Sequence, residues 1–276
     1  MGDRAFYRHY LLLAVPMILQ NAITNLVSFL DNIMVGQLGT EQMSGVAIVN
    51  QLIFVYNLAI FGAVSAASIF GAQYFGNGDH RGHMHSFRFK LYATLLVSGL
   101  TMLLLLTKGS DLISLYLTDT AGNGATDVAL QYGKQYLVIM LVGLVPFAVN
   151  QAYATNIKET GQTLVPMLAS FVAVGTNAVL DYLLIFGVGP FPKLGVTGAA
   201  LATVIARYVE AVIVVFWAHR NREKNRYLEG AYRGFGIPVS ELKTILIKGL
   251  PLMFNEVLWA AGMTTVTQCY SVRGLD

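Results

Sequence analysis

The chain has 276 residues, and only 12% of them are charged, which is about half the share in an ordinary soluble domain. The apolar share of 55% excludes a disordered chain, because disordered chains are poor in apolar residues and rich in charge. A single cysteine, Cys269, excludes a disulfide scaffold. The net charge of +3 is too small and too dispersed to indicate a nucleic-acid partner. The composition therefore predicts a polytopic membrane protein.

Seven apolar segments follow one another along the chain, each long enough to cross a lipid bilayer. The short alternating segments of a transmembrane β-barrel do not occur. We therefore expect an all-α membrane helix bundle. The predicted spans are residues 10–36, 44–73, 87–107, 129–156, 162–186, 195–218 and 242–270.

The 18 Lys and Arg residues predict how these spans are oriented. With a cytoplasmic N-terminus, thirteen of them lie on the cytoplasmic side, four lie outside, and Arg207 lies within a span. The positive-inside rule favours this orientation. The sequence thus predicts a multi-pass protein of the cytoplasmic (inner) membrane whose N-terminus is in the cytoplasm.

An internal repeat explains the odd number of predicted spans. An offset of 235 residues pairs Pro16 with Pro251 and Gly39 with Gly274, with apolar spans of equal length between them. Many secondary transporters are built from repeats of this kind. We therefore expect a six-helix N-terminal lobe (1–220), a cytoplasmic linker (221–241) and the first helix of an incomplete second lobe (242–276).

Two aspartates predict a cation site within the membrane. Charged side chains near the membrane centre cost about 2.5–3.5 kcal/mol each, so they face a bundle interior or water. Asp31 and Asp181 lie at similar depth, near the outer ends of the first and fifth predicted spans. Asn177 precedes Asp181 by four residues and shares its helix face. These three residues suit a cation, and close carboxylates can share a proton. We expect no structural metal and no cofactor.

Three further charged residues lie deep within predicted spans, well away from their ends. Glu256 lies near mid-membrane and is predicted to be a second group that responds to cations. Arg207 and Glu210 are three residues apart on the sixth span, so we expect them to pair and support the fold.

Several chemical motifs are weak or absent. The sequence has no G-x-x-x-x-G-K-[ST], H-E-x-x-H or G-x-S-x-G motif, so we expect that the chain is not an enzyme. Three histidines follow the second span, and we interpret them as part of a solvated loop rather than a metal site: His80, His83 and His85.

Several stretches resemble the multidrug and toxic compound extrusion (MATE) transporters. Residues 16–21 (PMILQN) and 31–40 (DNIMVGQLGT) resemble the first helix of that family. Residues 250–274, which include most of the seventh predicted span, resemble the first helix of its second lobe. Further matches are Asn50-Gln51, residues 71–76 (GAQYFG), Asn177-x-x-x-Asp181 and residues 195–203 (GVTGAALAT).

The resemblance implies twelve helices in two lobes, and export of organic cations in exchange for H⁺ or Na⁺. It implies that Asp31 is the essential first-helix carboxylate and that Asn177 and Asp181 are its partners in the same lobe. By the same resemblance, Thr203 matches a sixth-helix hydroxyl of that site. Glu256 matches a seventh-helix glutamate of some branches.

The expected function is therefore antiport of organic cations or drugs by alternating access, with the rest of the second lobe as a partner. One alternative is a lipid-linked saccharide flippase of related architecture, which would need more basic residues in its cavity than Arg207. Another is an intramembrane aspartyl protease, whose G-x-G-D motif is absent because Ala178-Val179-Leu180 precedes Asp181.

Overall fold

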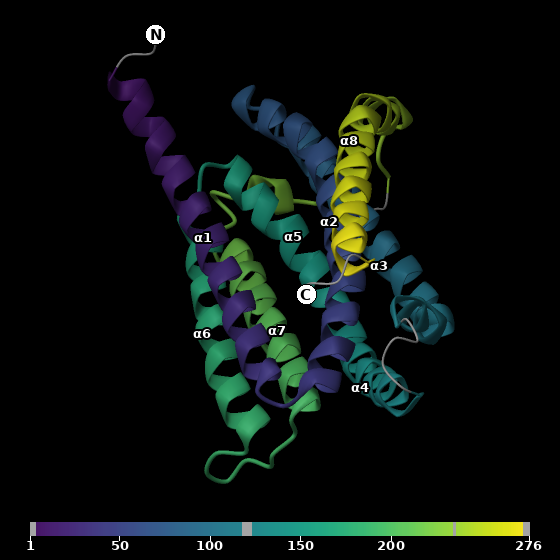
Figure 1. Ribbon diagram of the computed structural model, residues 1–276. Helices are drawn as coiled ribbons and strands as arrows, with labels where there is room; N and C mark the ends of the chain where they lie inside the picture. Colours follow the sequence, from purple (N-terminus) through teal and green to yellow (C-terminus); the bar gives the residue numbers. More distant parts are fainter. Residues whose placement is uncertain (1–3, 118–122, 234–235, 273–276) are drawn as a thin grey trace.

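The protein is a bundle of helices (Figure 1). The computed structural model describes residues 4–117, 123–233 and 236–272, and every regular element among them is helical, which confirms the predicted fold class. The elements are α1 (Arg4–Gly36), α2 (Thr40–Gly76), α3 (His80–Tyr116), α4 (Asn123–Val142), α5 (Leu144–Glu159), α6 (Leu164–Phe186), α7 (Val196–Arg220), the 3-10 helix η1 (Arg226–Leu228) and α8 (Val239–Val272).

Most of the predicted spans coincide with these helices. Among the described residues, α1, α2, α3, α6 and α7 have the length and hydropathy needed to cross a membrane, and α4 and α5 meet the same criteria when they are taken together as one bent segment. The protein is therefore a multi-pass membrane protein. Helix α8 covers the seventh predicted span, but many of its side chains lie outside the described part of the chain. The seventh span and the division into lobe, linker and second-lobe helix stay predictions.

The fourth predicted span, 129–156, is broken rather than continuous. Helices α4 and α5 meet at Gly143 and are bent by 44°. Pro146 lies in the first turn of α5. A proline has no N–H, and its ring clashes with the carbonyl four residues earlier, here that of Val142. Hydropathy does not register this change, so the sequence predicted the apolar segment but not the bend within it.

Helix α3 begins before its predicted span and contains all three clustered histidines. Asp79 caps its first turn, where the carboxylate accepts a hydrogen bond from the Gly82 N–H at 2.9 Å. His83 and His85 are only 2% and 7% exposed. The interpretation of these histidines as a solvated loop was therefore wrong for two of the three, because their polar rings find partners on neighbouring elements.

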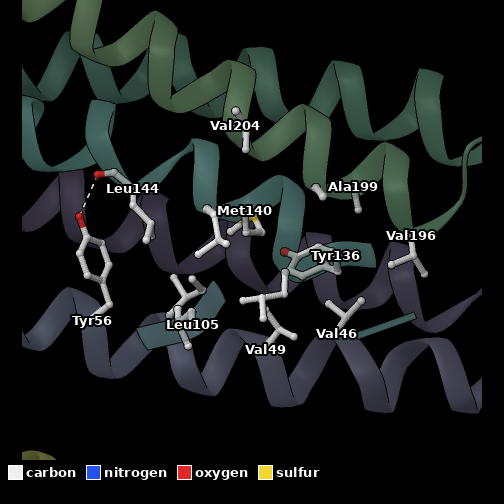
Figure 2. Close-up of a cluster of buried hydrophobic side chains, with 14 of the residues drawn as sticks. Val46, Val49, Tyr56, Leu105, Tyr136, Met140, Leu144, Val196, Ala199 and Val204 are labelled. Carbon is white, nitrogen blue, oxygen red and sulfur yellow. Dashed lines mark hydrogen bonds between the residues drawn. The ribbon is translucent and has the colours of Figure 1, made fainter. Parts of the chain in front are cut away.

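Helix α2 forms the centre of the bundle and packs against α3, α4 and α8. Its buried side chains recur every three or four residues, as expected for one helix face turned to a core. Figure 2 shows this face meeting side chains of α4 and α7. The hydroxyl of Tyr56 donates to the Leu144 carbonyl at 2.8 Å, so the start of α5 is tied to α2. The core therefore holds the broken span in place.

Helices α1 and α8 share one feature of the predicted repeat. Each contains a proline twelve residues after its first residue, Pro16 in α1 and Pro251 in α8. In the structure α1 packs mainly on α6, whereas α8 packs on α2. Gly249 permits the second contact, because a Cβ at this position would lie 2.3 Å from the Ala66 Cβ.

Candidate functional site

Three helix ends place the predicted site residues at one level of the bundle. Helices α1 and α6 end where α7 begins (Figure 1). Asp31 and Asp181 each lie five residues before the end of their helix, and Thr203 lies seven residues after the start of α7. At about 1.5 Å per residue, all three are within one or two helical turns of the same level. The charge distribution predicts that this end of the bundle faces outward.

The structure brings these residues into one cluster, which we call the outer carboxylate site: Asp31, Asn177, Asp181 and Thr203. Asn177 Nδ2 donates to Thr203 Oγ1 at 3.4 Å, which joins α6 to α7. The carboxylates of Asp31 and Asp181 are near enough to interact electrostatically. Asp181 is 1% exposed. One oxygen of each carboxylate, Oδ1, is buried and has no hydrogen-bond partner among the described residues.

Tyr136 of α4 also reaches this site, and sequence reasoning missed it. Its hydroxyl donates to Asn50 Oδ1 at 3.2 Å, and it lies near enough to both aspartates to interact electrostatically. Its ring is buried among the core side chains of Figure 2. A tyrosine within an apolar segment gives no local signal, because only the packing of α4 against α2 and α7 brings it to the carboxylates.

The chemistry of this cluster suits a small cation. A buried carboxylate oxygen without a donor is costly, and a bound proton or metal cation removes that cost. Amide and hydroxyl oxygens beside it add neutral ligands. Within the described residues, this site included, no group of three His, Cys, Asp or Glu side chains is placed to hold a metal ion.

The predicted pairing of Arg207 with Glu210 is wrong, since no ion pair joins them among the described residues. Arg207 Nη1 instead donates to the Gly143 carbonyl at 3.3 Å. Its guanidinium carbon also lies 5.1 Å from the centre of the Phe147 ring. The break between α4 and α5 exposes this carbonyl to Arg207, and the sequence prediction contained no such break.

Glu210 takes part in a different set of contacts, at the inner side of the outer carboxylate site. Ser170 Oγ donates to Glu210 Oε1 at 2.5 Å, and Gln20 Nε2 donates to Ser170 Oγ at 2.6 Å. This chain of hydrogen bonds joins α7, α6 and α1. It therefore anchors the first helix to the rest of the bundle below the level of Asp31.

A second cluster of charge lies at the opposite end of the bundle. Lys90 is fully buried, forms an ion pair with Glu159 and donates to Asn156 Oδ1 at 3.2 Å. His83 Nε2 lies 3.2 Å from Glu159 Oε2. Together with Arg88 of the same helix, we call these residues the inner charged network: His83, Arg88, Lys90, Asn156 and Glu159.

Arg88 connects this network to the predicted linker, 221–241. Its guanidinium donates to four backbone carbonyls of that segment at 2.6–3.0 Å, those of Gly230, Ala231, Arg233 and Gly236. The buried guanidinium of Arg88 thus holds the linker against α3, because it donates hydrogen bonds in several directions at once.

Glu256 is the one predicted site residue whose side chain the structure does not describe. It lies in α8. Its predicted role as a cation-responsive group stays a prediction.

The arrangement and the sequence both match known proteins. A family model described as MatE matches residues 16–183. The "Probable multidrug resistance protein NorM" of Thermotoga maritima is 26% identical over 266 residues, which cover 96% of this chain and 54% of that protein. The protein of the same name from Bacillus licheniformis is 27% identical over 248 residues, covering 90% and 53%.

Solved structures have the same fold. One described as the outward-facing conformation of a multidrug resistance MATE family transporter superposes with a TM-score of 0.78 at 23% identity, covering 93% of this chain and 54% of that one. The chain spans about half the length of the curated relatives it matches. Because the family model matches more than half of its residues, this chain belongs to the MatE family of MATE transporters.

Proposed function

We propose that this chain contributes the N-terminal lobe of a cation-coupled antiporter that exports organic cations, including drugs, across the cytoplasmic membrane by alternating access. The observation that carries the proposal is the outer carboxylate site, where Asp31 and Asp181 each keep a buried oxygen without a partner. Relatives named multidrug resistance proteins support drug export. Those relatives are about twice as long, so the proposed transporter includes the remaining helices of a second lobe.

The proposed coupling follows from charge. With neither H⁺ nor Na⁺ bound, the aspartates give the site negative charge that attracts a cationic substrate. A bound coupling ion removes part of that charge and lowers the affinity for the substrate. Ion and substrate therefore favour different conformations of the transporter, and each shifts the population toward the conformation that it binds better.

The membrane potential supplies the energy for such an exchange. One elementary charge that moves across the membrane gains about 2.3 kcal/mol for every 100 mV. Each coupling ion that enters with the potential can therefore offset a considerable concentration gradient of the exported compound.

The test is ethidium efflux from vesicles that contain the full-length gene product, with Na⁺ and pH gradients imposed separately. We expect Asp31→Asn and Asp181→Asn to abolish gradient-driven efflux while the protein still inserts into the membrane. The gradient that drives efflux in the unmodified protein identifies the coupling ion.

Asp111→Asn is a matched control, because Asp111 is exposed near the end of α3 and pairs only with the equally exposed Lys108. Its efflux should equal that of the unmodified protein. Efflux through Asp31→Asn at the unmodified rate would contradict the proposed role of the site. A peptide-cleavage assay on the same vesicles tests the protease alternative, for which we expect no activity.

A further inference from the structure

A pocket of about 350 Å³ lies beside the inner charged network. It opens where α2 ends, α3 begins and α5 ends, and the segment before and within η1 forms its remaining wall. The charge distribution places this end of the bundle in the cytoplasm. At about 30 Å³ for each water molecule, the pocket has room for a small polar group and several waters.

The walls of this pocket carry cations that lack counter-ions. Lys224 and Arg226 line it and form no ion pair within the part of the chain that the structure describes. Arg226 Nη1 lies 3.4 Å from His80 Nε2, so a third basic side chain stands at the same place. Glu223 is the acid among the lining residues. The two cations outnumber it, so the pocket favours an anion.

Tyr227 gives a second, independent indication of a ligand. It lines the pocket and is 1% exposed, and its hydroxyl has no hydrogen-bond partner among the described residues. Burial raises the pKa of Tyr227, so the hydroxyl keeps its proton and can donate it. A buried donor without an acceptor is costly, and a ligand rich in acceptor oxygens would satisfy it.

We propose that this pocket binds a phosphate group. Guanidinium, ammonium and hydroxyl donors are the groups that hold phosphate oxygens in proteins, and all three kinds line the pocket. The bound phosphate would join η1 to the start of α3. It comes either from the headgroup of an anionic phospholipid in the inner leaflet or from a soluble phosphate in the cytoplasm.

The test measures thermal unfolding of the purified full-length protein in two arms. In the first arm, sodium phosphate is titrated against sodium chloride at equal ionic strength. In the second arm, nanodiscs of phosphatidylglycerol are compared with nanodiscs of phosphatidylcholine. A midpoint raised by phosphate alone identifies a soluble source, and one raised only by phosphatidylglycerol identifies the lipid. No rise in either arm overturns the proposal.

Two variants and one control assign the effect to the pocket. Removal of a charged hydrogen-bond partner by Arg226→Gln should weaken binding about tenfold or more. Tyr227→Phe should weaken it by about two- to tenfold. The second variant keeps the ring that packs 5.0 Å from those of His83 and Phe87, so the fold is retained. Arg222→Gln changes an exposed neighbour that does not line the pocket, and it should bind normally. Equal losses in Arg222→Gln and Arg226→Gln would overturn the proposal.

Discussion

The outer carboxylate site and the inner charged network both bury charged groups, but they satisfy those groups very differently. In the inner charged network, Lys90 has an anionic and an amide partner, and Arg88 donates to four carbonyls. In the outer carboxylate site, Asp31 and Asp181 interact electrostatically, and one buried oxygen of each has no donor among the described residues. The inner charged network thus contains its own cation, whereas neither aspartate of the outer carboxylate site has a cationic partner among the described residues.

We propose that this difference separates charges that stabilise the fold from charges that serve a ligand. A buried charge whose hydrogen bonds are all made within the protein holds helices in one arrangement. A buried carboxylate with a free oxygen keeps a place for a cation that can come and go. Changes at the inner charged network should therefore affect stability, whereas changes at the outer carboxylate site should affect transport.

The largest expected effect on stability is that of Lys90→Met. It removes the buried cation and leaves Glu159 without its main partner, which costs about 3–5 kcal/mol. Thermal or denaturant unfolding of the purified protein in detergent measures the loss. Lys108→Met is the control, because its pair with Asp111 is exposed and such pairs contribute at most about 1 kcal/mol. Equal losses in both variants would show that the inner charged network does not stabilise the bundle.

Arg88→Lys should have a somewhat smaller effect. The charge remains, but a lysine cannot reach the four carbonyls that the guanidinium holds, so we expect a loss of about 2–3 kcal/mol. The segment around Gly230 should also open more often. Hydrogen exchange of its backbone amides measures this opening. The exposed Arg81→Lys serves as the control on the same helix, and exchange as slow as in the unmodified protein would contradict the prediction.

Gly71→Ala should destabilise the protein by about 1–3 kcal/mol through overpacking. A Cβ at this position would lie 2.2 Å from Glu159 Oε2 and 3.0 Å from Ser86 Oγ. The carboxylate would have to move away from Lys90. Gly99→Ala on α3 is the control, because a Cβ there meets nothing within 4 Å. A Gly71→Ala protein as stable as the Gly99→Ala protein would show that Glu159 has room to move.

The sequence predicted the bounds of a helix well where its apolar residues alone determine how it packs. The span 162–186 is α6 (Leu164–Phe186), and the span 195–218 is α7 (Val196–Arg220). The predicted bounds were wrong where a helix buries polar residues. The span 87–107 is much shorter than α3 (His80–Tyr116), because the first turns of that helix are polar in sequence yet satisfied by partners far away in the chain.

The sequence predicted only those residues of the outer carboxylate site that are recognisable within their own segment. Carboxylates stand out in an apolar segment, and helical spacing relates Asn177 to Asp181, so those residues could be found from the chain alone. Tyr136 could not, because it comes from another helix. The partner of Arg207 was also out of reach, since it is a backbone carbonyl at the break between α4 and α5.

The smallest expected effect on stability is that of Asp181→Asn. The amide has nearly the same shape, the buried Oδ1 has no hydrogen bond to lose, and one of two neighbouring negative charges disappears. We expect the free energy of unfolding to fall by no more than about 0.5 kcal/mol, or to rise by about 1–2 kcal/mol. Glu159→Gln makes the same chemical change in the inner charged network, where it leaves Lys90 buried without its anion and should cost several times more. The two variants, unfolded side by side in detergent, test the comparison directly, and equal losses would mean that the carboxylates of both regions serve the fold alike.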